Sequence, residues 1–390
     1  MNIITREQMG RLRVAMKMAA PKTIENYFYV CTTPKLIYSS QLLMNSIDRL
    51  RADSNDVLNF KLYYSVKANL NNRILNFIGN KVDGAEVSSE YEYKLATAAG
   101  IQRIISTAPV PSESFIMRLY EKGHVFDFDS FNSIERCGRY LSSREIGIRI
   151  RTPEQWISTD TQHNGSRFGI CLTEKYEVSR LVSILKENNL SICQLHYHGR
   201  VHGFEHQKQV CDYINYLLQE CPMLKNISAI SLGGGIDLFY SLGNSQINGF
   251  WNAISFFSRK IKRRNIKVIL EPGEQIVSTC GFLVVTVMDS VFRGGRQHLT
   301  VDSSGFNLLS WQEPWPYCIS MSDHCFYGNS VRCDTVIWGQ TCYEEDVFIR
   351  RMYLPKMKLG DRIVFYPMGA YTATTARHLH QIPSPSEILM

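Results

Sequence analysis

The sequence predicts an α/β protein in which a closed (β/α)8 barrel is followed by a smaller antiparallel β domain. Eight short apolar segments occur before residue 281, helix-like stretches separate most of them, and nearly all end in a polar, acidic or glycine residue. Parallel strands buried on both faces are typically near-continuous apolar runs, and barrel enzymes carry their chemistry at the C-terminal ends of these strands. We therefore expect the residues at the eight ends to converge on one site.

The expected strands follow each other along the chain as LYYSVK, VDGAEV, RIISTA, HVFDFDS, EIGIRIR, ICQLHYH, SAISLGGG and IKVILE. They end at Lys67, near Ser88, before Pro109, and at Asp129, Arg151, His198, Gly235 and Glu271. The barrel topology predicts that Lys67, His198, the glycines 233–235 and Glu271 lie close together.

Apolar residues at helical spacing occupy the connections between these strands. The stretch 89–99 stops before Gly100, a residue suited to a helix C-terminus. Single apolar faces are also expected in 176–189 and 210–224, and in a helix that carries Trp251, Ile254, Phe256 and Phe257. The basic run 259–264 behind that last face indicates a solvated helix end rather than a nucleic-acid patch.

The composition is typical of a globular protein. The chain has 390 residues, of which 44% are apolar and 20% charged, and this length accommodates a barrel of about 250 residues with a second domain. The net charge of +7 is modest and indicates no nucleic-acid partner. Because there is no apolar run of about 18 residues and no signal-peptide pattern, we expect a cytoplasmic protein without a membrane span.

Cysteine and histidine spacing argues against disulfides and metal. The eleven cysteines are scattered singly, without a CxxC pair, which favours free and mostly buried thiols in a reducing compartment. His196 and His198 would share one face of a strand, but no acid with matching spacing accompanies them. We therefore expect no metal site.

The pattern changes after Glu271. The short segments FLVVTVMDSVF, HLTVDSS, CDTVIWG and RIVFY are separated by turn residues and predict antiparallel strands. The strand-like NYFYVCT near the N-terminus would bury its apolar face by pairing with this sheet. We expect an N-terminal segment at 1–35 that packs with the β domain, a barrel at 36–280 and the β domain at 281–390.

The string YYSVKANLNNRIL carries the chemistry, since it places Lys67 at a strand end. A partly desolvated lysine there would favour the neutral amine that forms imines, although a lysine at such a position is more often structural or solvated. The string resembles the cofactor-lysine motif of the barrel-type (fold type III) pyridoxal-phosphate decarboxylases, the family of ornithine, arginine and diaminopimelate decarboxylases. The resemblance implies an alanine-racemase-like TIM barrel that binds pyridoxal 5'-phosphate through Lys67.

The other landmarks of that family follow in order along almost the whole chain. GAEVSSEYEYKLA resembles its acidic motif, with Glu86 where aspartate is usual and Glu92 on its glutamate, and NGSRFGI resembles its Ser-Lys-Phe-Gly segment. WGQTCYEED resembles its catalytic-cysteine loop, which carries Cys342 and Asp346 here. By this resemblance the cofactor-binding residues are Lys67, His198, Gly233, Gly234, Gly235, Glu271 and Tyr371.

The residue types suit these roles. Consecutive glycines let a phosphate approach backbone N–H groups because no Cβ intervenes, although an isolated glycine run could equally be a tight turn. The resemblance makes His198 the residue that stacks on the cofactor ring and Glu271 the carboxylate that keeps the pyridine nitrogen protonated. It makes Cys342 the acid that protonates the α-carbon. Taken alone, His198 would be a core histidine and Cys342 a buried thiol.

Three positions depart from the family pattern. Glu274 stands where an arginine usually contacts the phosphate, and Val110 stands where a lysine is common. Arg200, in HGRVHG, is a candidate for the missing phosphate contact. These departures leave a non-catalytic, regulatory relative open as an alternative, and an amino-acid racemase is a second alternative.

The substrate is expected to differ from the housekeeping ones. Diaminopimelate and ornithine enzymes carry an acid after the catalytic cysteine, whereas this chain has Tyr343. We expect Tyr343 and Asp346 to contact a conjugated or carboxylate-bearing diamino acid, as in siderophore or antibiotic pathways, and Arg200 or Arg332 to contact its tail. A diaminopimelate or ornithine decarboxylase is the alternative. In the family the cysteine loop enters the partner's active site, which implies a homodimer with shared sites.

Overall fold

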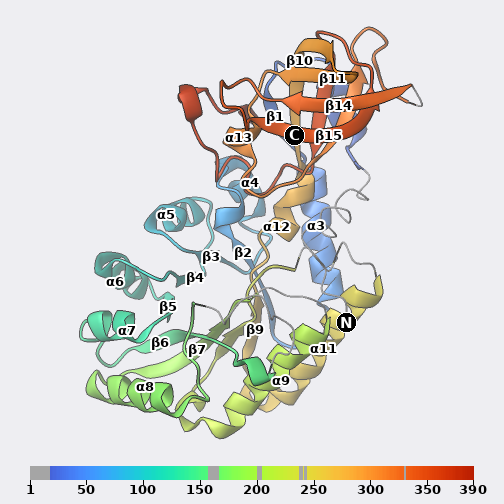
Figure 1. Cartoon of the computed structure of the whole chain (residues 1–390). Helices are drawn as coiled ribbons and strands as arrows, with labels where there is room; N and C mark the ends of the chain where they lie inside the picture. The colour runs from blue at the N-terminus through green and yellow to red at the C-terminus, as the bar shows by residue number, and fades with distance from the viewer. Residues whose placement is uncertain (1–17, 157–166, 200–203, 237–239, 241–243, 329–330) are drawn as a thin grey trace. The chain divides into compact units, whose positions relative to one another are not determined.

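The computed structural model describes residues 18–156, 167–199, 204–236, 240, 244–328 and 331–390 (Figure 1). The described chain divides into two compact units. The first unit contains Ile47–Lys67 and Leu75–Gly273, and the second contains residues 18–46, Ala68–Ile74 and Glu274–Met390. No helix in these ranges is long and apolar enough to cross a membrane.

The first unit is built around a closed barrel of eight parallel strands, in which β2 pairs with β9 to complete the ring. The strands are β2 (Phe60–Ser65), β3 (Gly84–Val87), β4 (Ile104–Thr107), β5 (Val125–Phe128), β6 (Glu145–Ile150), β7 (Ser191–Tyr197), β8 (Ala229–Ser231) and β9 (Lys267–Leu270). All eight predicted segments are thereby confirmed as barrel strands. Most of their residues are buried, because helices cover the outer face and side chains fill the inside.

Helices surround this barrel and alternate with its strands, as Figure 1 shows for α5 to α8. The long helices are α3 (Ser40–Asp53), α4 (Asn72–Ile78), α5 (Glu90–Ala98), α6 (Glu113–Glu121), α7 (Phe131–Gly138), α8 (Lys175–Glu187), α9 (Phe204–Glu220) and α11 (Asn244–Lys260). In α11 the expected apolar face is confirmed for Trp251, Ile254 and Phe257, which are buried, but it is wrong for Phe256, which is 58% exposed. Phe256 directly precedes Phe257 in the helix, and adjacent residues point about 100° apart.

Helix α5 begins with a well-formed cap. The Ser89 hydroxyl accepts the N–H of Glu92 at 3.2 Å, and the Glu92 carboxylate accepts the N–H of Ser88 at 2.7 Å. Gly100 follows the helix with φ +80°, a conformation that only glycine adopts without strain. The predicted stop at Gly100 is confirmed, and Glu92 contributes to positioning the chain after β3.

The second unit contains a nine-stranded sheet in the order β13-β12-β16-β10-β11-β14-β15, with β1 beside β10 and β17 beside β1. Its strands are β1 (Lys35–Tyr38), β10 (Gly281–Arg293), β11 (Arg296–Val301), β12 (Trp315–Ser320), β13 (Cys325–Phe326), β14 (Arg332–Trp338), β15 (Val347–Pro355), β16 (Arg362–Tyr366) and β17 (Ser386–Leu389). The sheet is mostly antiparallel, as predicted. Two pairs, β11 with β14 and β1 with β17, are parallel, because the long connections between these strands allow a crossover.

The N-terminal segment differs from the sequence-based expectation. The string NYFYVCT was predicted as a strand, but helix α2 (Lys22–Phe28) covers its first half. Ile24 and Phe28 are four residues apart and both buried, so helical spacing places them on one face. The strand that joins the sheet is instead β1, which pairs with β10. The second unit thus includes residues 36–46, which we had assigned to the barrel.

The apolar cluster beneath α2 predicts a position on which stability depends. Phe282 on β10 is fully buried and contacts Phe28 and Tyr366, with ring centroids 5.5 and 5.0 Å away. We expect Phe282→Ala to cost about 3–5 kcal/mol, because it removes buried area and leaves a cavity. Phe292, on the same strand, is 49% exposed, so Phe292→Ala is the matched control and should cost less than about 1 kcal/mol. The midpoint of urea unfolding measures both, and similar shifts would contradict this account of the core.

Candidate active site at the ends of the barrel strands

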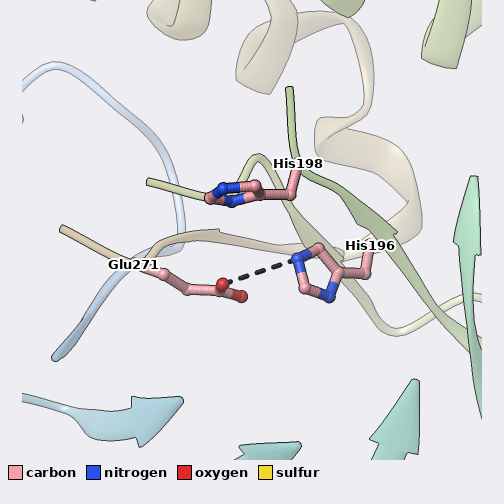
Figure 2. A group of neighbouring side chains, drawn as sticks. All are labelled: His196, His198 and Glu271. Carbon is pink, nitrogen blue, oxygen red and sulfur yellow. Dashed lines mark ion pairs between the residues drawn. The ribbon is translucent and has the colours of Figure 1, made fainter. Parts of the chain in front are cut away.

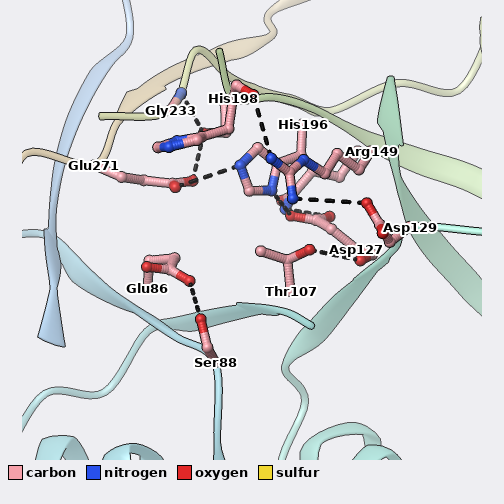
Figure 3. A network of polar contacts seen from close by, with 12 residues as sticks. Glu86, Ser88, Thr107, Asp127, Asp129, Arg149, His196, His198, Gly233 and Glu271 are labelled. Atoms are coloured by element: carbon pink, nitrogen blue, oxygen red, sulfur yellow. Dashed lines mark hydrogen bonds and ion pairs between the residues drawn. The ribbon is translucent and has the colours of Figure 1, made fainter. Parts of the chain in front are cut away.

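Lys67 lies just after β2, in the short turn η1 (Val66–Ala68), and forms an ion pair with Glu86. The Lys67 Nζ lies 3.0 Å from Glu86 Oε2, and the Ser65 hydroxyl donates to the same oxygen at 2.6 Å. The Ser88 hydroxyl donates to Glu86 Oε1 at 3.1 Å (Figure 3). Burial raises the pKa of Glu86, but Lys67 and Ser65 outweigh this and bring the pKa to about 2. Glu86 is therefore an anion held by three donors.

This ion pair corrects the expectation for Lys67. We expected desolvation to favour its neutral amine, but the side chain is 39% exposed and faces a carboxylate, which favours the ammonium. The register of β2 against β3 places Ser65 opposite Glu86, a pairing that the sequence alone does not reveal. Lys67 must lose a proton before its nitrogen can attack a carbonyl group, and the ion pair with Glu86 opposes that loss.

Glu271, at the end of β9, belongs to a second buried network. Its Oε1 accepts the hydroxyl of Ser231, and its Oε2 lies 3.5 Å from His196 Nε2. The other ring nitrogen of His196 lies 3.1 Å from Asp127 Oδ2, and Gln194 donates to both oxygens of Asp127 at 2.8 and 2.9 Å. Burial lowers the pKa of His196, but Glu271 and Asp127 outweigh it and raise the pKa. The two carboxylates on either side of the ring thus favour the protonated form of His196.

The two histidines and Glu271 form a compact group. Each of His196, His198 and Glu271 offers a ligand atom, and these atoms lie within 4.8 Å of one another (Figure 2). Our expectation that no acid accompanies the histidines was therefore wrong, because Glu271 comes from a strand far along the chain. Asp127 hydrogen-bonds to His196 and Ser231 to Glu271, whereas the Nε2 atom of His196 has no hydrogen-bond partner among the described residues.

His198 is a neutral imidazole. Burial lowers its pKa most, the charges of Lys67, His196 and Arg149 lower it further, and the result is about 3. Its Nδ1 accepts the N–H of Gly234 at 3.3 Å, which fixes the ring. A fixed, uncharged ring is suited to packing against the flat face of an aromatic ligand.

The turn after β8 requires glycine, because neighbouring backbone atoms leave no room for a Cβ at Gly233 or Gly234. Gly233 and Gly235 have φ of +71° and +76°. A Cβ on Gly233 would lie 2.6 Å from the Tyr197 carbonyl oxygen, and a Cβ on Gly234 would lie 2.5 Å from that of Glu271. Larger residues would therefore push apart the ends of β7, β8 and β9.

The same turn offers fewer N–H groups than we expected. Gly233 donates to the Ser231 hydroxyl at 3.1 Å, and Gly234 donates to His198. Among the described residues no acceptor is found for the N–H of Gly235, and a Cβ there would meet only one atom, 3.9 Å away. The structure therefore favours an anion at Gly235 rather than along the whole glycine run.

Arg149, on β6, is a buried cation that we did not single out from the sequence. Its Nη1 lies 3.6 Å from Asp129, its Nη2 donates to the His198 carbonyl at 3.2 Å, and its guanidinium lies over the Phe168 ring at 4.5 Å. A signal in the sequence could have identified it: polar residues alternate with apolar ones in some barrel strands, as Asp127 and Asp129 do in HVFDFDS, and alternate residues point to the same side of a strand. Arg149 thus fixes the backbone that carries His198.

The second unit holds the expected cysteine loop. Cys342 is exposed, and Tyr343 is 44% exposed with its ring edge against Phe306, 4.7 Å between centroids. Asp346 is buried, and its carboxylate accepts the N–H groups of Phe306 and Thr341, both at 2.9 Å. It also accepts the Ser304 hydroxyl at 3.0 Å. These bonds indicate that Asp346 holds the loop in shape, instead of contacting substrate as we expected.

Tyr371 also lies in the second unit. It adopts φ +57°, its N–H donates to the Ala68 carbonyl at 2.7 Å, and its ring contacts Trp311 at 5.0 Å. Glu274, in place of the family's arginine, begins α12 (Glu274–Val277). Arg200 lies outside the described residues, so its proposed phosphate contact stays a prediction.

Together, a closed barrel with a lysine, a neutral histidine, a buried carboxylate and a glycine turn at its strand ends defines the class of barrel enzymes that bind pyridoxal phosphate. Residues 44–278 match the pyridoxal-dependent decarboxylase, pyridoxal binding domain. The chain belongs to this family and is a pyridoxal-phosphate-dependent carboxy-lyase. This assignment favours catalysis over the non-catalytic alternative.

Known relatives cover most of the chain. Diaminopimelate decarboxylase of Escherichia coli is 25% identical over 383 residues, which span 91% of this chain and 88% of that protein. A 2-[(L-alanin-3-ylcarbamoyl)methyl]-2-hydroxybutanedioate decarboxylase of Staphylococcus aureus is also 25% identical, over 82% of this chain and 85% of its own length. The arginine decarboxylase of Paramecium bursaria Chlorella virus has a similar fold, with a TM-score of 0.80, 18% identity and coverage of 94% and 98%.

The residues present fit pyridoxal phosphate. The Gly235 N–H and the open space beside it suit the phosphate, and neutral His198 suits the ring. Glu271 lies 3.5 Å from His196, and a carboxylate in this setting suits the ring nitrogen. Lys67 supplies an amine.

These residues lead to a test of cofactor attachment. We expect protein incubated with pyridoxal phosphate to absorb near about 420 nm, and Lys67→Ala to lose this band, since the amine that binds the cofactor is gone. Lys61→Ala is the control, because Lys61 lies on the same strand but pairs with Asp83 at 3.5 Å. A band retained in Lys67→Ala, or lost in Lys61→Ala, would contradict the assignment.

Proposed function

We propose that this decarboxylase acts on an amino acid whose side chain is joined to a larger group with a neutral or carboxylate-bearing end, in siderophore or other secondary-metabolite biosynthesis. The observation that carries the proposal is Tyr343, which follows Cys342 where ornithine and diaminopimelate enzymes carry an acid. Its ring is partly exposed and packs on Phe306. An aromatic side chain there offers no charge partner to a free distal ammonium. The staphylococcal relative, named for such a conjugate, supports the proposal.

The proposed roles follow from the contacts of each residue. When bound, pyridoxal phosphate supplies a conjugated ring that accepts the electron pair released as carbon dioxide leaves. Lys67 would hold it covalently once its nitrogen has lost a proton, with the Glu86 carboxylate beside it. Glu271, beside His196, would keep the ring nitrogen protonated, and His198 would pack against the ring. Cys342, whose thiol is exposed, would donate a proton to the α-carbon.

The second candidate is a diaminopimelate or ornithine decarboxylase. The similarity to the Escherichia coli enzyme favours it, and the cysteine loop also carries the exposed acids Glu344 and Glu345. Glu345 already pairs with Arg350 and is therefore less available to bind a substrate ammonium. Glu344 would have to take that role.

Substrate comparison separates the two candidates. We expect kcat/KM for a citryl amide of L-2,3-diaminopropionate to exceed that for ornithine, lysine and diaminopimelate by about tenfold or more, since an unpaired ammonium is poorly accommodated beside Tyr343. Tyr343→Glu should raise kcat/KM for the free diamino acids. Tyr353→Glu is the matched control, because Tyr353 is an exposed tyrosine of β15 in the same unit. Faster turnover of any free diamino acid by the unmodified protein would favour the second candidate.

We also propose a homodimer with shared sites, in which Cys342 and Tyr371 act with the barrel residues of the partner. Mixing Lys67→Ala with Cys342→Ala protomers should then restore up to about a quarter of the activity, since half of the dimers are hybrids with one intact site. Mixing Lys67→Ala with Glu271→Ala protomers is the control. Each protomer then carries a substitution in its own barrel, so neither site of a hybrid dimer is intact. Absence of recovery after verified subunit exchange would place Cys342 and Lys67 of one chain in the same site.

A further inference from the structure

Arg377, in the second unit, is an exposed arginine held in a fixed position. Its guanidinium lies over the Phe306 ring, with 4.7 Å between Cζ and the ring centroid. Its Nη1 donates to the Phe306 carbonyl at 2.8 Å, and its backbone N–H donates to the Asn307 carbonyl at 2.7 Å. Stacking and one hydrogen bond thus restrain the side chain, and a second hydrogen bond holds its backbone.

The charge of Arg377 is not neutralised within the described part of the chain, where no carboxylate lies within 4.0 Å of it. Three other arginines of this unit are paired, Arg296 and Arg351 with Asp334 and Arg350 with Glu345. A fixed guanidinium with unused N–H donors is prepared for a carboxylate, which it can bind through two parallel hydrogen bonds.

Contacts connect Arg377 to the cysteine loop. The Phe306 ring lies between the two, since its other contact is the Tyr343 ring, 4.7 Å away at an interplanar angle of 64°. The Phe306 N–H is anchored by buried Asp346, which also anchors Thr341 just before Cys342. We call Arg377, Phe306 and Tyr343 the arginine stack.

We propose that Arg377 binds a carboxylate at the far end of the substrate and so determines specificity. This rests on the proposed function, because it requires Cys342 and Tyr343 to face the substrate. The stack then offers an aromatic surface next to the cysteine and a cation one ring further away. A substrate with a carboxylate several bonds from its amino acid end meets both, whereas a free diamino acid would bring an ammonium toward a guanidinium and be repelled.

The test compares two probes on the holoenzyme, the citryl and the acetyl amides of L-2,3-diaminopropionate, which differ in their distal carboxylates. Arg377→Gln should lower kcat/KM for the citryl probe by about 10–100-fold, and for the acetyl probe by less than about twofold. Arg377→Lys should keep part of the preference, since it retains the charge but not the two-bond geometry. Arg351→Gln is the matched control, an exposed arginine already paired with Asp334. The cofactor absorbance should stay unchanged in all variants.

Citrate binding, measured by calorimetry, tests Arg377 independently of turnover. Wild-type holoenzyme should bind citrate, and Arg377→Gln should bind it at least about tenfold more weakly. Equal losses on both probes, an unchanged citryl probe, or citrate binding that is absent or independent of Arg377 would overturn the inference. If neither conjugate is decarboxylated but citrate binding depends on Arg377, the substrate proposal fails, and with it the role of Arg377 in specificity, while Arg377 is still a carboxylate-binding residue.

Discussion

The site depends on one buried histidine, His196, whose ring lies between Asp127 and Glu271. Burial raises the pKa of Glu271, and the neighbouring His196 opposes that effect. Removing one member of such a buried set typically costs about 3–5 kcal/mol, because the remaining charge loses its partner. Gly147 belongs to the same arrangement, since a Cβ there would lie 1.8 Å from Asp127 Oδ1. Packing and protonation are thus coupled at the centre of the barrel.

Each charged pair of the barrel joins residues of different strands. Lys67, just after β2, pairs with Glu86 on β3. Arg149 on β6 pairs with Asp129, just after β5. His196 on β7 pairs with Glu271, just after β9. The pairs therefore exist only when the barrel is closed. The acids beside Lys67 and His196 also differ, since Lys67 and Ser65 hold the pKa of Glu86 well below its usual value, whereas burial raises the pKa of Glu271.

The sequence predicted the barrel because short, mostly apolar runs are a strong signal for buried parallel strands, which have three to seven residues here. It also predicted that Lys67, His198 and Glu271 converge, since strand ends share one edge. It did not predict that Asp127 and Glu271 flank His196, because such contacts depend on register across the ring. The helix at Lys22–Phe28 was missed for a similar reason, since aromatic residues favour strands locally and only burial of Ile24 with Phe28 selects the helix.

The two units carry different parts of the proposed chemistry. The charges of the barrel concern the cofactor and the α-carbon, which all substrates of this family share, so they contain no information about the far end of a substrate. The cysteine loop is shaped by Asp346, whose three hydrogen bonds are independent of the residues exposed on the loop. Tyr343 can therefore differ from the acid of the relatives without disturbing the loop or the barrel. Specificity is free to change on one surface while the electrostatics of the barrel stay constant.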